Sequence, residues 1–569
     1  MTNHQDHYQT DSDQNLVLIA KNTLVWLNQL SHFYGRPIRF LNEIPADELE
    51  RLSGLGINGL WLVGIWERSP ASQKIKQLYG NTNQIASAYS IYSYQIARDL
   101  GGKKALDALK KKANRSGIEL ACDMVPNHTG LDSPWLIDHP DWYISTKRSP
   151  NADWLFESPN LLTEKTKQVQ IEESYYTQSG AAEVFRYRDL EKGEEKFIYH
   201  GNDGTSMPWN DTAQLNYLIP QVRKAVIQQI LDISRSFRII RLDAAMTLVK
   251  QHFRRLWFPE TGEPKCIPTR EHFNIPQADF DRLMPGEFWL EVMDEIKKSS
   301  PNTLFLAEAF WLMERFFIIE LGIQRVYNSA FMHHLKDEKN AALRQYLLDI
   351  LDQNPVILER FVNFLTTPDE KPAIEKFGKS AKYFGSCALM ASLPGLPLFG
   401  HGQIEGFSEH YGMDVAEPFL HEKPDKSFME EHTRLITSLL LQRSRFSSAR
   451  DLVLFDFVTP TQEVDKNVIV FSNQFRDLKT LVLFNNSPQS AFGKIGRAIC
   501  RIEKFSHLKN PNCHILEAIN LPREGYGELL LKNLQINTTY GIPISQSKEQ
   551  GLEFQLPPYG FFAFDVSLK

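Results

Sequence analysis

The sequence predicts an α/β fold: a (β/α)8 TIM barrel with a subdomain inserted after its third strand and a C-terminal all-β sandwich domain. Short apolar runs alternate with amphipathic stretches along most of the chain, which is the pattern of repeated strand and helix units. Eight such runs are present, and eight strands close a barrel of this type. After residue 447 the pattern changes to alternating apolar and polar residues between turn residues, which is typical of antiparallel strands.

We expect the barrel strands at residues 24–26, 59–63, 119–125, 238–242, 304–307, 324–327, 361–365 and 396–399. Residues 103–113 place apolar side chains at helical spacing with lysines on the other face, and residues 219–233 repeat this spacing after an early proline. These two stretches are the expected crossover helices, because parallel strands need such connections.

Four segments follow from these patterns. We expect a polar N-terminal tail at 1–20, the barrel at 21–446 and the β-sandwich domain at 447–569. Residues 129–217 fill the long gap between the third and fourth strands and are rich in Trp, Tyr, Asn, Asp and Gly. They predict an inserted subdomain on the loop side of the barrel, where insertions shape substrate sites.

Composition argues against several classes of partner. A net charge of -6, a pI near 6.3 and the absence of long Lys or Arg blocks give no basic field for nucleic acid or an anionic membrane. The first residues lack the pattern of a secretory signal, and no apolar run reaches the ~18 residues of a membrane span, so we expect a cytoplasmic location. Five scattered cysteines without CxxC spacing predict neither a disulfide framework nor a zinc site. The oligomeric state stays open.

An acid follows its own strand at three places, and the carboxyl ends of barrel strands surround one pocket. Cleavage of a glycosidic bond with retention needs one carboxylate to attack the anomeric carbon and one protonated carboxyl to assist the leaving oxygen. Asp243 ends an apolar strand, and Arg241 projects from the same face two residues earlier. An adjacent guanidinium lowers the pKa of a carboxyl, which suits a nucleophile. A structural ion pair explains this motif equally well.

Glu308 and Asp369 are the other two acids. Glu308 follows an apolar strand and precedes aromatic residues that include Trp311; burial among them would raise its pKa, as a proton donor requires. A helix cap or a salt-bridge partner is the alternative role for a lone Glu at this place. Asp369 lies in a Pro-containing turn, where an extra carboxylate would steady an oxocarbenium-like transition state. Pro-Asp is also ordinary turn chemistry.

The third strand closes with polar residues. We expect Asp123 and Asn127 to brace the pocket and the insertion, and His128 to meet the hydroxyl groups of a sugar. An isolated histidine is more often structural. The combination of four strand-end motifs therefore carries the prediction.

These motifs are DMVPNH at 123–128, RLD at 241–243, AEAFW at 307–311 and TPDE at 367–370. In this order they resemble the sequence regions of glycoside hydrolase family 13, the α-amylase family. The resemblance covers roughly residues 20–569, since Ala-Tyr-Ser at 88–90, Leu-Asn-Tyr at 215–217 and Gly-His-Gly-Gln at 400–403 also resemble family landmarks. It implies an enzyme that acts on oligosaccharide or polysaccharide α-glucans.

Carried over residue by residue, the resemblance implies that Asp243 is the nucleophile, Glu308 the acid/base and Asp369 the transition-state stabiliser. It further implies that Tyr89 stacks on the bound sugar and that Arg241 orients Asp243. The complete set of implied substrate-binding residues is Arg241, His128, Tyr89, Asp123, Asn127 and Trp311.

Three positions depart from the family pattern. The fourth region usually reads Asn-His-Asp, whereas Thr367 stands before Pro-Asp here; such a version resembles maltosyltransferases that use maltose 1-phosphate. Met246 and Thr247 replace a Lys-His pair that would grip the neighbouring sugar. Gln214 stands where the family's calcium site has an acid, and calcium prefers anionic oxygen, which weakens the case for calcium. We therefore expect no metal and no other cofactor, with a calcium ion as the alternative.

Three functions stay open on this basis. The first is a retaining α-glycosidase that acts on α-glucans or maltooligosaccharides. The second is an α-glucan transglycosylase or a phosphate-dependent, maltosyltransferase-like enzyme. The third is a catalytically silent glycan-binding homologue, against which the three intact acids count.

Overall fold

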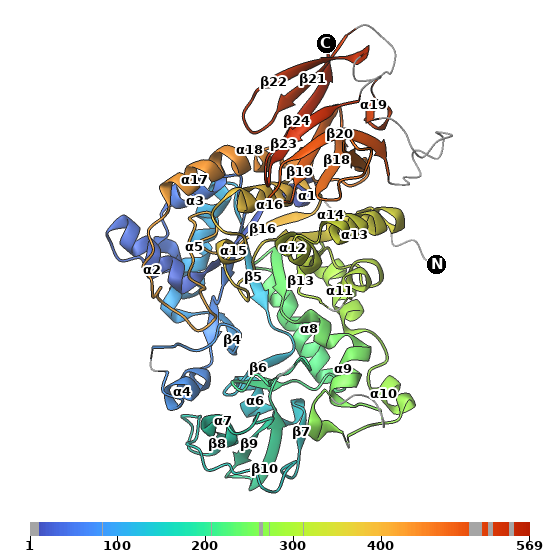
Figure 1. Cartoon of the computed structure of the whole chain (residues 1–569). Coiled ribbons are helices and arrows are strands. Elements are labelled where there is room, and N and C mark those ends of the chain that lie inside the picture. The colour runs from blue at the N-terminus through green and yellow to red at the C-terminus, as the bar shows by residue number, and fades with distance from the viewer. Residues whose placement is uncertain are drawn as a thin grey trace.

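The computed structural model describes residues 11–81, 83–205, 207–260, 266–271, 273–310, 312–499, 515–519, 521, 527–545 and 551–569. Trp311, Cys500 and Cys513 lie outside these residues. The described chain comprises a central barrel, an insertion on one side of it and a set of C-terminal strands on the opposite side (Figure 1).

Eight parallel strands close the barrel, as predicted. Each strand pairs with the next one in the chain, and the eighth pairs with the first. All of their residues are buried apart from partly exposed Glu119, because side chains fill the interior and helices cover the outside. The strands are β1 (Leu18–Asn22), β2 (Gly59–Val63), β5 (Glu119–Met124), β12 (Ile239–Leu242), β13 (Leu304–Ala307), β14 (Arg325–Tyr327), β15 (Phe361–Phe364) and β16 (Leu396–Phe399).

The prediction for the first strand is wrong. Residues 24–26 lie in α2 (Thr23–Tyr34), and β1 begins at Leu18, inside the segment 1–20 that was expected to be a tail. Asn22 ends the strand and caps the helix, since its side chain accepts a hydrogen bond from the N–H of Val25. Apolar residues lie on both sides of this cap, so hydrophobicity alone does not locate the strand.

Helices connect the strands on the outside of the barrel. The two predicted crossover helices are α5 (Gly102–Arg115) and α8 (Pro220–Ser234), and Pro220 occupies the first turn of α8, where a missing N–H breaks no helical bond. No helix of the described residues is long and apolar enough to cross a membrane. The other helices outside the insertion and the C-terminal strands are α1 (Asp11–Gln14), α3 (Ala46–Gly54), α4 (Pro70–Leu78), α9 (Lys250–Trp257), α10 (Gln277–Leu283), α11 (Phe288–Ser299), α12 (Ser329–Lys336), α13 (Asn340–Gln353), α14 (Val356–Arg360), α15 (Ala373–Phe377), α16 (Ala381–Ser392), α17 (Lys426–His432) and α18 (Ser438–Leu440).

The segment between β5 and β12 forms its own small antiparallel sheet in the order β7-β10-β9-β8. A two-stranded ladder of β6 and β11 joins this segment to the end of β5, and a second ladder pairs β3 with β4. The elements are β3 (Trp66–Arg68), β4 (Ile91–Ile96), β6 (His128–Gly130), α6 (Pro134–Asp138), β7 (Ser145–Thr146), β8 (Lys167–Ile171), α7 (Ser174–Thr177), β9 (Val184–Asp189), β10 (Glu194–Tyr199) and β11 (Thr212–Gln214).

The C-terminal region is an all-β domain, whose strands form one antiparallel ladder in the order β22-β21-β24-β19-β18-β17-β20-β23. It packs closely on the barrel. Asn340 of α13 donates to Asn467 Oδ1 and to the Asn486 carbonyl, and a side chain added at Gly385 of α16 would overlap Phe484. The elements are β17 (Val453–Val458), β18 (Val468–Phe475), β19 (Leu478–Asn485), β20 (Ala491–Ala498), α19 (Ile515–Ala518), β21 (Glu528–Asn533), β22 (Thr539–Pro543), β23 (Glu553–Leu556) and β24 (Phe561–Leu568).

Candidate active site

Four carboxyl groups surround the guanidinium of Arg241 at the carboxyl ends of the barrel strands. Its Nη1 contacts Asp243 Oδ1 and lies 3.3 Å from Asp123 Oδ1. Its Nη2 lies 2.8 Å from Glu308 Oε2 and 3.4 Å from Asp369 Oδ2. The Arg241 side chain is 1% exposed, so one buried cation holds the three predicted catalytic acids and Asp123 together.

Strand register explains this convergence. Arg241 on β12 is the direct partner of Asp123 on β5 and of Leu306 on β13. The hydrogen bonds between neighbouring strands continue one residue beyond the strand ends, from Asp243 N–H to the Met124 carbonyl at 2.9 Å and from Glu308 N–H to the Leu242 carbonyl at 3.0 Å. Both acids therefore leave the barrel at the same level.

Three aromatic rings surround the guanidinium. The ring centroids of Tyr89, Trp61 and Tyr327 lie 5.2, 5.4 and 5.9 Å from its central carbon. Trp61 Nε1–H also donates to Asp123 Oδ2 at 3.0 Å. Tyr89 thus stands at the site, as predicted, while Trp61 and Tyr327 were missed. Both could have been found in the sequence as aromatic residues on predicted barrel strands, at positions that face the inside of the barrel.

Glu308 is oriented by a strained residue. The N–H of Ala244 donates to Glu308 Oε2 at 2.8 Å, and Ala244 has a φ of 44°, in the left-handed region. This conformation disfavours a residue with a Cβ by roughly 1–2 kcal/mol. The turn directly after Asp243 accepts this strain while it directs its N–H at the second acid.

Burial raises the pKa of Glu308, the predicted direction, with Arg241 opposing the rise and Asp243 reinforcing it. Burial likewise raises the pKa of Asp243, and the attraction of Arg241 only opposes it. The expectation that Arg241 would dominate the pKa of Asp243 is therefore wrong. The cost of removing the carboxylate from water outweighs the charge and the hydrogen bond of Arg241.

The pKa values of Asp123 and Asp369 are also raised, and burial is the largest cause in both. Burial raises the pKa of Asp123 to about 7, against the attraction of Arg241 and the hydrogen bond from Trp61. Burial and the charge of Glu308 raise the pKa of Asp369 to about 8. The Asp369 side chain is 38% exposed, so solvent tempers this rise, whereas the exposed fractions of Asp243 and Glu308 are only 9% and 11%.

Residues 45–347, more than half of the chain, match the family model of the α-amylase catalytic domain. The chain belongs to the α-amylase family. It is therefore an enzyme of the glycoside hydrolases. The matched range includes Asp123, Asp243 and Glu308, and it ends before Asp369.

The chain is also similar, at low sequence identity, to individual known proteins. A glucan 1,6-alpha-glucosidase from Streptococcus dysgalactiae subsp. equisimilis is 27% identical over 125 residues, which are 21% of this chain and only 19% of that protein. An α-amylase from Lactobacillus plantarum has a TM-score of 0.60 at 14% identity, with 98% of this chain and 99% of that chain covered. A debranching enzyme from Nostoc punctiforme has a TM-score of 0.57 at 15% identity, with 98% and 100% covered. At these identities the structures show a shared fold.

The calcium site of the α-amylase family does not fit the residues present. Asn127 Nδ2–H donates to Gln214 Oε1 at 3.0 Å, and Gln214 Nε2–H donates to Asn127 Oδ1 at 2.9 Å and to the Leu215 carbonyl at 3.2 Å. Amide hydrogens point at the oxygens that a cation would need. Among the described residues, no group of three His, Cys, Asp or Glu side chains is arranged to hold a metal.

Asn127 therefore braces the insertion, as predicted, by joining the end of β5 to β11. His128 is 4% exposed, and its ring packs 5.1 Å from Trp209 of the insertion. Burial lowers the pKa of His128 to about 4, so the imidazole is neutral at physiological pH. A neutral ring suits hydrogen bonding to hydroxyl groups.

Met246 and Thr247 replace the family's Lys-His pair and are turned into the core. Met246 is 3% exposed and Thr247 is fully buried, where its hydroxyl donates to the Ala244 carbonyl at 2.7 Å. The wall of the site after Asp243 therefore has no charged side chain at these two positions.

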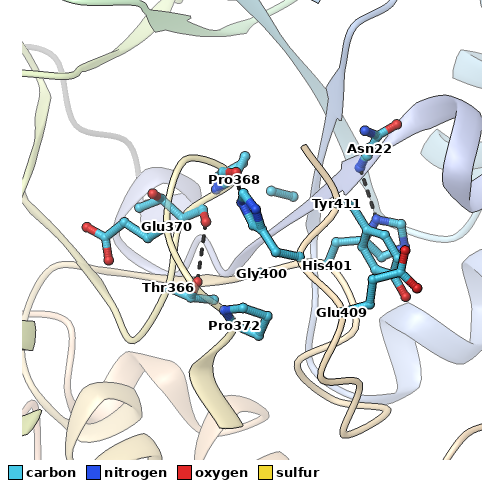
Figure 2. A pocket seen from close by; sticks show the side chains of 12 residues that line it. Asn22, Thr366, Pro368, Glu370, Pro372, Gly400, His401, Glu409 and Tyr411 are labelled. Atoms are coloured by element: carbon cyan, nitrogen blue, oxygen red, sulfur yellow. Dashed lines mark hydrogen bonds between the residues drawn. The ribbon is translucent and has the colours of Figure 1, made fainter. Parts of the chain in front are cut away.

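A pocket lies beside Asp369, between the 366–372 turn and the loop after β16. Pro368 and Glu370 line one side of it, while His401, Tyr411 and Asn22 line the other (Figure 2). Asn22 and His401 stand at the carboxyl ends of β1 and β16, so this pocket opens on the same face of the barrel as the acids.

Proposed function

We propose that the chain is a retaining α-glycosidase that acts on α-glucans or maltooligosaccharides. The observation that carries the proposal is the single buried guanidinium of Arg241, which contacts Asp243, Glu308 and Asp369 at once. Retaining cleavage needs two carboxyl groups in different protonation states about 5–5.5 Å apart, and strand-end acids on neighbouring barrel strands suit this requirement.

In the proposed double displacement, Asp243 attacks the anomeric carbon while Glu308 gives its proton to the leaving oxygen. The bond between sugar and leaving group breaks as a covalent bond between sugar and Asp243 forms. Glu308 then takes a proton from water as the water oxygen bonds to the anomeric carbon and the bond from that carbon to Asp243 breaks, so the sugar leaves with its original anomeric configuration. The raised pKa of Glu308 favours the protonated form that the first step needs. Asp369, the most exposed acid, would steady the positive charge of the transition state.

Transfer to a sugar or to phosphate is a second candidate function. It is supported by Pro368, which stands where the family has a sugar-contacting histidine, and by the inward-turned Met246 and Thr247. Addition of inorganic phosphate or of a maltose 1-phosphate donor would change the product from free sugar to an exchanged or elongated glycoside. A product pattern that neither addition alters would rule this candidate out.

Hydrolysis is tested with maltooligosaccharides and glycogen, with product analysis by NMR. We expect release of sugars that first appear as the α-anomer, and loss of at least ~10³-fold in kcat for Asp243→Asn, because the nucleophile is removed. Asp107→Asn on the outer face of α5, whose side chain is 49% exposed, is the matched control and should keep full activity. First appearance of the β-anomer would reject the retaining mechanism.

A silent glycan-binding protein is the third possibility. It predicts that the wild type and Asp243→Asn behave identically on every α-glucoside while both bind glucan. Cytoplasmic location and α-glucan as substrate stay predictions that rest on the sequence and the family.

A further inference from the structure

Asp369 is the most loosely held of the three acids. Its contact with Arg241 is 3.4 Å long, against 2.8 Å for Glu308, and its side chain is more than three times as exposed as that of Glu308. It does not follow β15 directly, since the strand ends at Phe364. Its position therefore depends on the turn that carries it, in which the Glu370 N–H donates to the Thr367 carbonyl at 3.2 Å.

A histidine from a different loop holds this turn. His410 Nε2 lies 2.9 Å from the carbonyl oxygen of Pro368, and since a carbonyl can only accept, Nε2–H is the donor. This carbonyl belongs to the peptide unit that leads into Asp369. Because a peptide unit is planar, a fixed carbonyl also fixes the N–H and the Cα of the following residue.

The residue before His410 is anchored. Glu409 is 8% exposed, and its two carboxylate oxygens accept the backbone N–H groups of Phe419 at 2.7 Å and Leu420 at 2.8 Å. Charged acceptors make such bonds strong. The loop after β16 is thereby closed on itself next to His410.

The residue after His410 is anchored as well, to the first barrel strand. His401 Nδ1 accepts the N–H of Asn22 at 3.2 Å, so its Nε2 carries the proton and donates to Gln29 Oε1 at 2.9 Å. Gln29 Nε2–H donates in turn to the hydroxyl of Tyr411 at 2.9 Å. A continuous chain of hydrogen bonds thus runs from the end of β1 to the neighbour of His410.

The pocket of Figure 2 lies between the 366–372 turn and the loop after β16. Its polar groups are largely used inside the protein: Asn22 Nδ2–H donates to the Gly412 carbonyl, and Glu370 pairs with Lys376. His401, Glu409 and Tyr411 make the bonds given above. Because these side chains are already hydrogen-bonded within the protein, they suit a structural role that fixes the position of the 366–372 turn.

We propose that His410 is a positioning residue that sets the place of Asp369 through the Pro368 carbonyl, so that the loop after β16 tunes the reaction without touching the reacting atoms. This inference rests on the proposed function of Asp369 as transition-state stabiliser. His410 is exposed, so its replacement should leave the core intact.

The test compares three replacements of His410 in the full chain. His410→Gln places an amide N–H where Nε2 stands, His410→Asn is too short to reach the carbonyl, and His410→Ala has no donor. We expect kcat to fall about tenfold or more for Ala and Asn with KM changed less than about twofold, because a misplaced stabiliser weakens only the transition state. Gln should restore kcat to within about threefold of the wild type, and Tm should be the same in all three.

Coupling to Asp369 is the readout that a merely structural role would not move. If His410 acts through Asp369, then His410→Ala should lower kcat in the wild type but have little further effect in the Asp369→Asn background, measured on an activated aryl α-glucoside. Additive losses, or wild-type kcat for His410→Ala, would overturn the inference. A wild type that is inactive on all α-glucosides would instead defeat the proposed function, so the two failures are distinct.

Discussion

Nη2 of Arg241 lies 2.8 Å from Oε2 of Glu308, so the proposed acid/base shares its cation with the proposed nucleophile, Asp243. The same guanidinium opposes the rise in the pKa of both carboxyl groups. Arg241 therefore keeps the pKa of Glu308 from rising as far as burial alone would take it. Arg241 is therefore expected to influence the pH dependence of the reaction through both carboxyl groups.

Arg241→Lys is expected to reduce kcat/KM by about 100-fold or more and to move the alkaline limb of its pH profile to higher pH. A lysine ammonium lacks the planar, forked donor set with which the guanidinium contacts four carboxyl groups. Glu308 therefore loses the attraction of the cation and keeps its proton to higher pH. The measurement is kcat/KM between pH 4 and 9, with exposed Arg36→Lys as control. An alkaline limb that stays in place would contradict the role of Arg241.

Asp123→Asn is expected to gain in stability over the wild type as the pH rises. The pKa of Asp123 is about 7 in the folded protein and ~3.9 in an unfolded chain, so between these values the folded state binds more protons. The wild type consequently loses stability as the pH rises from about 4 to 7, and the neutral amide does not. The Tm difference between variant and wild type should grow from about pH 4.5 to about pH 7.5, roughly the window set by these two pKa values. A difference that is constant with pH would show that Asp123 ionises normally.

The extent to which sequence could predict this molecule depends on whether the signal was local. The strands Gly59–Val63, Leu304–Ala307 and Leu396–Phe399 were predicted to the residue because each is a short apolar run with clear flanks. Asp243 and Glu308 could be placed at one pocket because each directly follows its strand.

The rest depended on contacts distant in sequence. His410 is 42 residues from the carbonyl that it holds, and Trp61 is 62 residues from Asp123, so no local pattern joins them. The rise in the pKa of Asp243 follows from burial by the whole fold, which the adjacent Arg241 could not reveal.

Gln214→Ala is expected to lower Tm, while a chelator should leave the Tm of the wild type unchanged. The buried Asn127 side chain loses its amide partner, and an unsatisfied buried polar group costs about 1–3 kcal/mol. Differential scanning calorimetry with and without EDTA measures both effects, and Gln277→Ala, an exposed position, is the control. A wild-type Tm that EDTA lowers and Ca²⁺ restores would refute the amide-pair interpretation.

Asn340→Ala is expected to destabilise the contact between barrel and C-terminal domain. Asn340 donates to Asn467 and Asn486 and accepts from Asn486 Nδ2 at 2.6 Å, so its loss leaves buried groups without partners. We expect Tm to fall by about 2–4 °C per kcal/mol lost, with limited proteolysis accelerated at the junction. Gln345→Ala on the exposed face of the same helix should change neither quantity.

Gly385 has a consequence for how this enzyme can diversify. Helix α16 has no side chain at Gly385, where the Phe484 ring and the Tyr559 carbonyl lie against it. The contact between barrel and C-terminal domain therefore leaves no room for a Cβ at this position. A recombinant that takes its last domain from a relative would need an equally flat helix or a smaller ring to meet it. Exchange of the C-terminal domain between relatives therefore requires that the residues facing position 385 are exchanged with it.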